Sequence, residues 1–103
     1  MVYNVILTEF AQSQLDNIVS YVAFDLCNKS AASEILSDVE EAVGQLSFSA
    51  DVYALCTESE LKEHNYIRFH LRRHRYILLY RIVKSDVYID RIYHELQDYQ
   101  HLL

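Results

Sequence analysis

Most of the side chains that could do chemistry lie in one stretch, from Tyr66 to His94. Its first half interleaves four arginines with two histidines and a tyrosine, namely Arg68, His70, Arg72, Arg73, His74, Arg75 and Tyr76. Guanidinium groups bind phosphates and carboxylates, and aromatic rings stack on bases, so this pattern suits a surface for a polyanion. An equally good interpretation is a solvated turn whose arginine stems cover the edge of a sheet.

His94 ends the stretch and is the sharpest candidate for acid–base chemistry, because histidine exchanges protons near neutral pH. The alternative is a strand-end histidine that makes an ordinary hydrogen bond. His70 and His74 fall on a predicted strand and turn, without paired Cys or His partners, so no zinc site is expected. Cys27 and Cys56 lack CxxC spacing and are expected to be free thiols.

The composition restricts the classes of function. The chain has a single glycine and no proline, which excludes a glycine-rich phosphate loop or a dinucleotide fingerprint. We therefore expect no cofactor and no metal. With 103 residues, of which 51% are hydrophobic, the chain is expected to form one folded domain over residues 1–103. No apolar run approaches the roughly 18 residues of a membrane span, and the N-terminus does not resemble a signal peptide, so we expect a cytoplasmic protein.

The charge is distributed unevenly along the chain, whose net charge is −6. Eight of the nine Lys and Arg residues lie between Lys62 and His94, where only three acidic residues oppose them. The stretch is therefore basic and the segments before it are acidic, so one face of the protein could meet a polyanion. The overall acidity argues against tight unaided binding of nucleic acid, which depends on phosphate contacts.

The first half of the chain predicts one strand and a helical hairpin. A strand is expected from Tyr3 to Leu7, followed by Thr8 as the N-cap of a helix over about residues 9–26. Its apolar face is Ala11, Leu15, Ile18, Val22 and Leu26. Asn28 or Ser30 caps a second helix over about residues 30–47, with Asp38, Glu40 and Glu41 opposite its apolar face. The short connection predicts antiparallel packing of the two helices.

The second half predicts a loop followed by three strands. Residues 47–64 fit neither period and are expected to be a loop with a helical turn near Ser59 to Glu63. Strands are expected at Tyr66–Leu71, Tyr76–Val83 and Val87–Tyr93, with a turn at Lys84–Asp86. The apolar positions change phase near Asp90 and Arg91, which predicts a β-bulge there. Apolar residues at 96, 99, 102 and 103 suggest a short C-terminal helix. Together these elements predict an α+β domain with a helical hairpin on one face of a mainly antiparallel sheet.

Two parts of the sequence resemble a known family. The first is Leu7-Thr8-Glu9-Phe10-Ala11, followed by Leu15, Ile18 and Tyr21-Val22. The second is the run from Tyr76 to Val83, then Val87 to His94, then Gln97-Asp98-Tyr99. In order and spacing they are similar to the RelE/ParE superfamily of toxins from bacterial toxin–antitoxin systems, over almost the whole chain.

The resemblance implies two possible targets and one kind of partner. RelE-like members cut messenger RNA in the ribosomal A site without a metal, whereas ParE-like members poison DNA gyrase. Both kinds are neutralised by an antitoxin whose C-terminal segment wraps around the toxin, in a toxin–antitoxin hetero-oligomer. A basic, strand-rich surface would suit an acidic antitoxin tail.

The residues implied by the resemblance match the nuclease set only in part. His94, preceded by Tyr93, sits where some nucleases keep a catalytic histidine, and Arg68, Arg75, Arg81 and Arg91 are candidates for stabilising the phosphate. Ile77 and Leu96 stand where the nucleases have arginines. The sequence thus predicts a toxin that is a ribosome-dependent endoribonuclease. A gyrase inhibitor without enzymatic activity, or a decayed toxin that only binds antitoxin, remains as an alternative.

Overall fold

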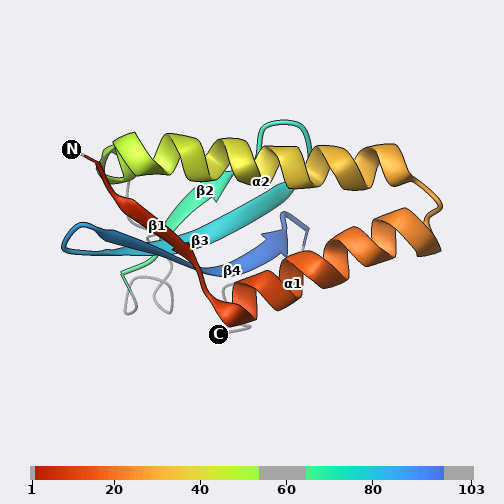
Figure 1. Ribbon diagram of the computed structural model, residues 1–103, viewed down its shortest axis with the longest axis horizontal. Coiled ribbons are helices and arrows are strands. Elements are labelled where there is room, and N and C mark those ends of the chain that lie inside the picture. Colours follow the sequence, from red (N-terminus) through yellow and green to blue (C-terminus); the bar gives the residue numbers. More distant parts are fainter. Residues whose placement is uncertain (1, 54–64, 97–103) are drawn as a thin grey trace.

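Four strands form one mixed sheet in the computed structural model, which describes residues 2–53 and 65–96 (Figure 1). The strands lie in the order β1 (Asn4–Leu7), β4 (Asp86–His94), β3 (Tyr76–Val83) and β2 (Ile67–His70). β1 runs parallel to β4, whereas β2, β3 and β4 form an antiparallel meander. The predicted α+β class and the predicted order of elements are confirmed.

Two helices connect β1 to β2, and each begins at a side-chain cap. α1 (Glu9–Ser20) starts after Thr8, whose hydroxyl oxygen accepts a hydrogen bond from the Ala11 N–H at 3.3 Å. α2 (Lys29–Ser49) starts after Asn28, whose side chain accepts from the Ala31 N–H at 3.0 Å. These side chains satisfy N–H groups that have no partner within the helix. A 3₁₀ turn, η2 (Ala50–Val52), follows α2.

A π-helical turn, η1 (Tyr21–Asp25), ends the first helix and changes which residues face the core. The Leu26 N–H donates to the Tyr21 carbonyl five residues earlier, at 3.0 Å. The wider turn carries the following residues out of the α-helical phase. Val22 is still buried, but Leu26, predicted on the apolar face, is 56% exposed.

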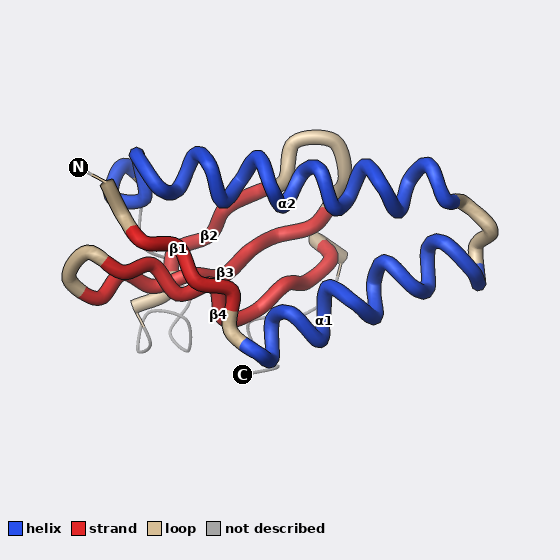
Figure 2. The backbone as a smooth tube through the Cα atoms, in the orientation of Figure 1, coloured by secondary structure: helices blue, strands red, loops and turns tan. Residues whose placement is uncertain are grey.

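Both helices pack on the same face of the sheet (Figure 2). The main core joins apolar residues of α1 and α2 to alternate residues of the strands, including Phe69, Leu78, Tyr80 and Ile89. A second, smaller cluster on the opposite face, here called the far face, contains Tyr66, Ile77, Leu79 and Tyr93. The helices meet near η1 and separate towards β1 (Figure 1).

β3 and β4 form the centre of the sheet, and their pairing contains the predicted bulge. Leu79 pairs with Arg91 and the next residue, Tyr80, pairs with Ile89, so Asp90 is the additional residue. The bulge restores Ile92 to the core, where it pairs with Leu78. The turn between the two strands places Lys84 at a φ of 58°.

α1 covers the part of β4 that extends beyond β1. β1 pairs with β4 only as far as Ile89, and the Ile89 carbonyl accepts bonds from the N–H and the hydroxyl of Thr8. Further along, the Ile92 N–H donates to the side-chain oxygen of Gln14, at 2.7 Å. A glutamine of α1 thus takes the place of a strand at this edge.

Two predicted helical segments, near residues 59–63 and at the C-terminus, lie outside the described residues. Among the helices that the structure does describe, none has the length and apolar character needed to cross a membrane.

Candidate functional site

The six predicted site residues fall into two groups. Four of them occupy strand positions on the far face. Tyr93 belongs to its apolar cluster, Arg68 and Arg91 pair with Leu79, and Arg81 lies two residues after Leu79 on β3. Arg75 and His94 lie at the other location, where β3 begins and β4 ends. The structure therefore does not bring His94 together with the far-face arginines.

The bulge residue Asp90 organises the far-face group. Its carboxylate accepts a hydrogen bond from the Tyr66 hydroxyl at 2.8 Å and one from Arg81 Nε at 2.7 Å. Asp90 is only 9% exposed. A buried carboxylate needs such partners because its charge is poorly solvated. The bulge is what directs Asp90 to this face, between core residue Ile89 and Arg91.

This network changes the protonation chemistry of Tyr66. Burial, followed by the hydrogen bond to Asp90 and its negative charge, raises the pKa of Tyr66 to about 12. The bond to Asp90 also raises the pKa of Arg81, against the effect of burial. The Arg81 guanidinium lies 4.6 Å from the centre of the Tyr88 ring. Tyr66 is thus held neutral and Arg81 charged, in one structural unit.

The other two far-face candidates also have partners within the chain. The Arg91 guanidinium lies 4.1 Å from the centre of the Phe10 ring in α1, and its Nη1 donates to the Asp90 carbonyl. Tyr93 is buried in the far-face cluster. Stacking on Phe10 and the bond to the bulge fix the position of Arg91 beside α1.

Arg75 and His94, the two residues at the strand ends, line a cavity of about 380 Å³ between β3, β4 and the helical hairpin. His94 meets the Tyr76 ring edge to face at 5.2 Å, and its Nδ1 accepts a hydrogen bond from the Leu96 N–H at 3.2 Å. Because Nδ1 accepts, the neutral ring carries its proton on Nε2. Arg75 reaches Glu95 at 3.1 Å. Val22, Ala31 and Ile35 form an apolar wall opposite.

The loop between β2 and β3 is fixed to α2 by the other buried carboxylate, Asp38. Predicted to lie opposite the apolar face, Asp38 is instead 2% exposed. It accepts bonds from the backbone N–H of Arg73 at 3.0 Å and from Arg73 Nε at 2.7 Å. His74 contacts Glu34 at 3.2 Å, and Arg72 lies 3.8 Å from Glu41.

Opposing effects act on Asp38. Burial alone raises the pKa of this carboxyl, but the two hydrogen bonds from Arg73 and its positive charge outweigh burial and lower the pKa. The same side-chain bond raises the pKa of Arg73. Asp38 is therefore charged in the folded protein, and the predicted basic loop is neutralised by acids of α2.

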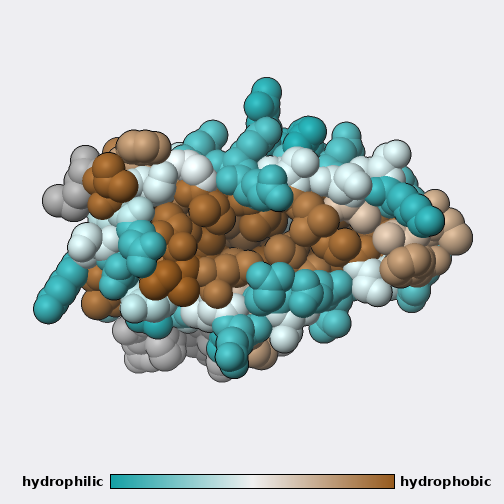
Figure 3. Space-filling model, in the orientation of Figure 1, coloured by the Kyte–Doolittle hydropathy of each residue, from teal (hydrophilic) through white to brown (hydrophobic). Residues whose placement is uncertain are grey.

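An apolar groove runs between α1 and α2. Figure 3 shows apolar side chains along the middle of this face, with hydrophilic residues on both flanks. Partly buried apolar residues of β1 and both helices pack against the core, among them Val5, Leu7, Val19, Ala23 and Val43. Apolar side chains gathered on one face with polar residues around them are a feature of sites for protein partners.

Comparison with protein families connects this architecture to known toxins. A model described as the ParE toxin of the type II toxin–antitoxin system, parDE, matches residues 5–99. The chain belongs to this family.

The ParE family assignment agrees with the fold. A solved structure described as the chromosomal ParDE toxin–antitoxin system from P. aeruginosa contains a chain with a TM-score of 0.72 and 20% sequence identity to this one. The match covers 90% of this chain and 96% of that one. None of the curated proteins compared matches the chain. The predicted RelE/ParE resemblance is thus confirmed, on its ParE side.

Sequence reasoning missed two features of this ParE-family chain. One is the role of Asp38, although Glu34, Asp38 and Glu41 recur at helical spacing and could have been recognised as one acidic stripe facing the arginines. The other is the groove, because the spacing of apolar residues does not show how far two helices stand apart.

Proposed function

We propose that this chain is the toxin of a type II pair, neutralised by a cognate antitoxin in the apolar groove. We further propose that it acts by inhibiting DNA gyrase and has no enzymatic activity. Membership of the ParE family supports the toxin role. Of the two targets that the sequence resemblance implies, gyrase is the one linked to ParE-like members, and the ParE family match favours it.

The observation that carries the non-enzymatic proposal is that two of the four candidate arginines are paired with carboxylates of the chain. Arg75 contacts Glu95, and Arg81 binds Asp90 at 2.7 Å. In the adjoining loop, Arg73 binds Asp38, also at 2.7 Å. To stabilise a phosphate, each guanidinium would have to leave its carboxylate, and the buried carboxylates Asp90 and Asp38 would then lose a partner. These arginines are better explained as parts of the fold.

A supercoiling assay with purified protein and gyrase tests the proposed target. We expect dose-dependent inhibition that His94→Gln and Arg75→Gln leave unchanged. Mapping of RNA ends after induction in cells should show no ribosome-dependent cuts. Absence of inhibition at saturating toxin would contradict the proposal.

The groove supports the proposal that an amphipathic antitoxin segment binds there through its apolar face. Coexpression with the product of the reading frame adjacent to the gene, followed by copurification, tests this site. Val43→Glu puts a charge beside the core in the groove and should abolish copurification, whereas Glu40→Lys on the exposed side of α2 should not. Circular dichroism of both variants separates lost binding from lost folding. Retained binding by Val43→Glu would place the antitoxin elsewhere.

A ribosome-dependent endoribonuclease is the second candidate, because one observation favours it. His94, Arg75 and Tyr76 line the same cavity, which brings an imidazole, a guanidinium and a phenol together. On this alternative, induction produces cuts in the ribosomal A site, and His94→Gln abolishes both the cuts and growth arrest. No growth arrest at all, with antitoxin binding retained, would indicate a decayed toxin.

A further inference from the structure

The helical hairpin ends in a tip, residues 21–30, that lies away from the sheet. Figure 1 shows the joined ends of α1 and α2 projecting beyond the strands, at one end of a molecule whose longest extent is 40 Å. Phe24, at this tip, is 67% exposed. Single exposed apolar residues are common, so the surroundings of Phe24 decide whether it serves a purpose.

The backbone of the tip adopts two uncommon conformations. Phe24 lies in the π-helical turn η1, and such turns are rare and are often found at functional sites. Cys27 follows in the left-handed region, at a φ of 51°, where glycine is the usual residue. The turn thus carries an exposed side chain where glycine would be less strained, and this side chain lies next to Phe24 in the same hollow.

Phe24 and Cys27 form the apolar part of this hollow, which has a volume of about 450 Å³. The other residues that line it are Ala23, Asn28, Lys29 and Ser30. Because Phe24 is part of the lining, a second aromatic ring placed in the hollow would lie against the Phe24 ring. Aromatic pairs stabilise a contact beyond the area that they bury.

The charges of the tip complement one another. Asp25 and Lys29 are the only charged residues between positions 21 and 33, so the net charge of this segment is zero. Both are exposed, and neither forms an ion pair with another described residue. The chain as a whole, with its net charge of −6, repels a second copy of itself. Charges more than roughly 8 Å apart are screened at physiological salt, so two copies repel one another least when they meet at this neutral end.

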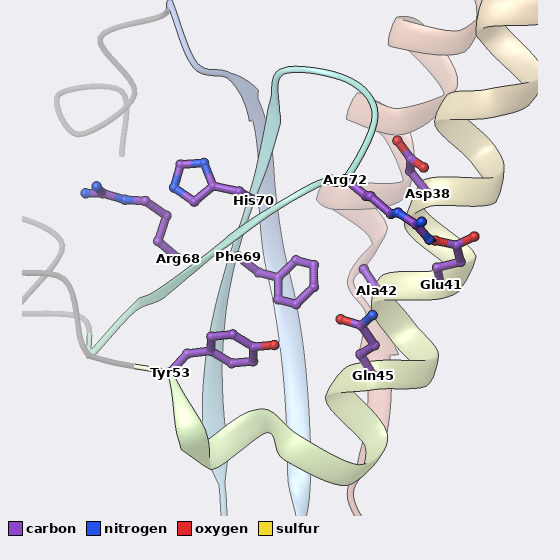
Figure 4. Close-up of a pocket in the computed structure, with 9 residues that line it drawn as sticks. All are labelled: Asp38, Glu41, Ala42, Gln45, Tyr53, Arg68, Phe69, His70 and Arg72. Atoms are coloured by element: carbon purple, nitrogen blue, oxygen red, sulfur yellow. The ribbon is translucent and has the colours of Figure 1, made fainter.

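The cavity between β2 and α2 has a different arrangement of charge. Figure 4 shows Asp38, Glu41 and Arg72 together on one side of it. Arg72 lies 3.8 Å from Glu41, and Asp38 is bound by Arg73. These charges are paired within the chain, whereas the acid and the base of the tip are available to a partner that carries the same two charges.

We infer that the hairpin tip is a contact between two copies of this chain, related by a two-fold axis. Phe24 of each copy enters the hollow of the other, and Lys29 of each copy pairs with Asp25 of the other. A contact of this kind uses the same surface twice and closes on itself, so association stops at the dimer. The surface is small, which makes the dimer weak and dependent on concentration. The inference stands whether or not gyrase is the target.

Sedimentation equilibrium of the full chain tests the inference. The apparent mass should rise from 12.2 kDa towards twice that value as the concentration increases from about 5 to about 500 µM. Phe24→Glu should weaken the dimer at least tenfold, because it removes the ring that fills the hollow. Phe48→Glu is the matched control, since Phe48 is 69% exposed and lies at the other end of α2. Circular dichroism shows whether each variant folds.

A charge exchange tests the two-fold geometry. Lys29→Glu and Asp25→Lys should each weaken self-association about fivefold, because each variant sets like charges against one another. An equimolar mixture of the two variants should regain dimers of wild-type affinity, since both pairs in the mixed dimer then join opposite charges.

The mass of a single chain over the whole concentration range would overturn the inference. Equal dimerisation of Phe24→Glu and Phe48→Glu, or no recovery in the mixture of charge variants, would overturn it as well. A monomeric chain that loses antitoxin copurification or gyrase inhibition through Phe24→Glu would assign the tip to that partner instead of a second copy.

Discussion

Asp38 and Asp90 are the two buried carboxylates of the described residues, and each holds an arginine in a different setting. Asp38 lies on a helix and binds both the backbone and the side chain of Arg73, so it fixes a loop. Asp90 lies in a bulge and binds only side chains, Tyr66 and Arg81. The comparison shows that arginines resembling a phosphate site in the sequence can serve the fold in two distinct ways.

The largest expected effect is the loss of Asp38. Asp38→Ala should lower the free energy of unfolding by about 3 kcal/mol, because the backbone N–H and the guanidinium of Arg73 both lose their charged acceptor. Urea denaturation measures the change, with Glu40→Ala on the exposed side of the same helix as control. Equal stability of Asp38→Ala and this control would mean that the contact between Asp38 and Arg73 does not stabilise the fold.

Asp90→Ala should cost less, about 2 kcal/mol, since the main loss is the acceptor of the buried Tyr66 hydroxyl. Arg81 remains stacked on Tyr88 and partly solvated. The same denaturation experiment compares the two sites, and Ser85→Ala in the neighbouring turn is the control. A larger effect at Asp90 than at Asp38 would reverse their order.

Tyr66→Phe isolates the hydroxyl and should cost about 1 kcal/mol near neutral pH. In the wild type the pKa of Tyr66 is raised to about 12, above the ordinary value of about 10. Its contribution is therefore complete below pH 10 and is lost as the pH rises towards 12. The stability difference between wild type and Tyr66→Phe should shrink over this window and then reverse. A constant difference would mean that Asp90 does not hold the phenol neutral.

The smallest effect concerns acid. The pKa of Asp38 is lowered in the folded state, so its contribution is present above the unfolded pKa and declines as the pH falls through the folded pKa. Asp38→Asn should flatten the stability profile below about pH 4, the ordinary range for an aspartate. Stability curves from pH 2 to 6 for both proteins would show this, and parallel curves would contradict it.

The local elements could be predicted from the sequence because their determinants are local. Thr8 and Asn28 cap helices through bonds to residues three positions away, and the phase change near Asp90 predicts the bulge. Which side chains pair could not be predicted in the same way. Arg73 and Asp38 are 35 residues apart, and their contact exists only once the loop folds onto α2.

The candidate site was harder to predict for a related reason. Tyr93 and His94 are adjacent in sequence, but successive residues of a strand point to opposite faces. One is buried in the far-face cluster and the other lines the cavity beside the helical hairpin. A motif that looks continuous in the sequence is thus divided by the sheet.

The parallel pairing of β1 with β4 affects the order in which the sheet can be completed during synthesis. Asn4 pairs with Asp86, 82 residues later. At about 5–20 residues per second, roughly 4–16 s pass between the synthesis of the two partners. Until then β1 has no strand to join, although α1, α2 and the hairpin of β2 and β3 can already form local contacts. β1 is therefore made well before the strand that it joins, so the groove beside it is completed only after β4 has been synthesised.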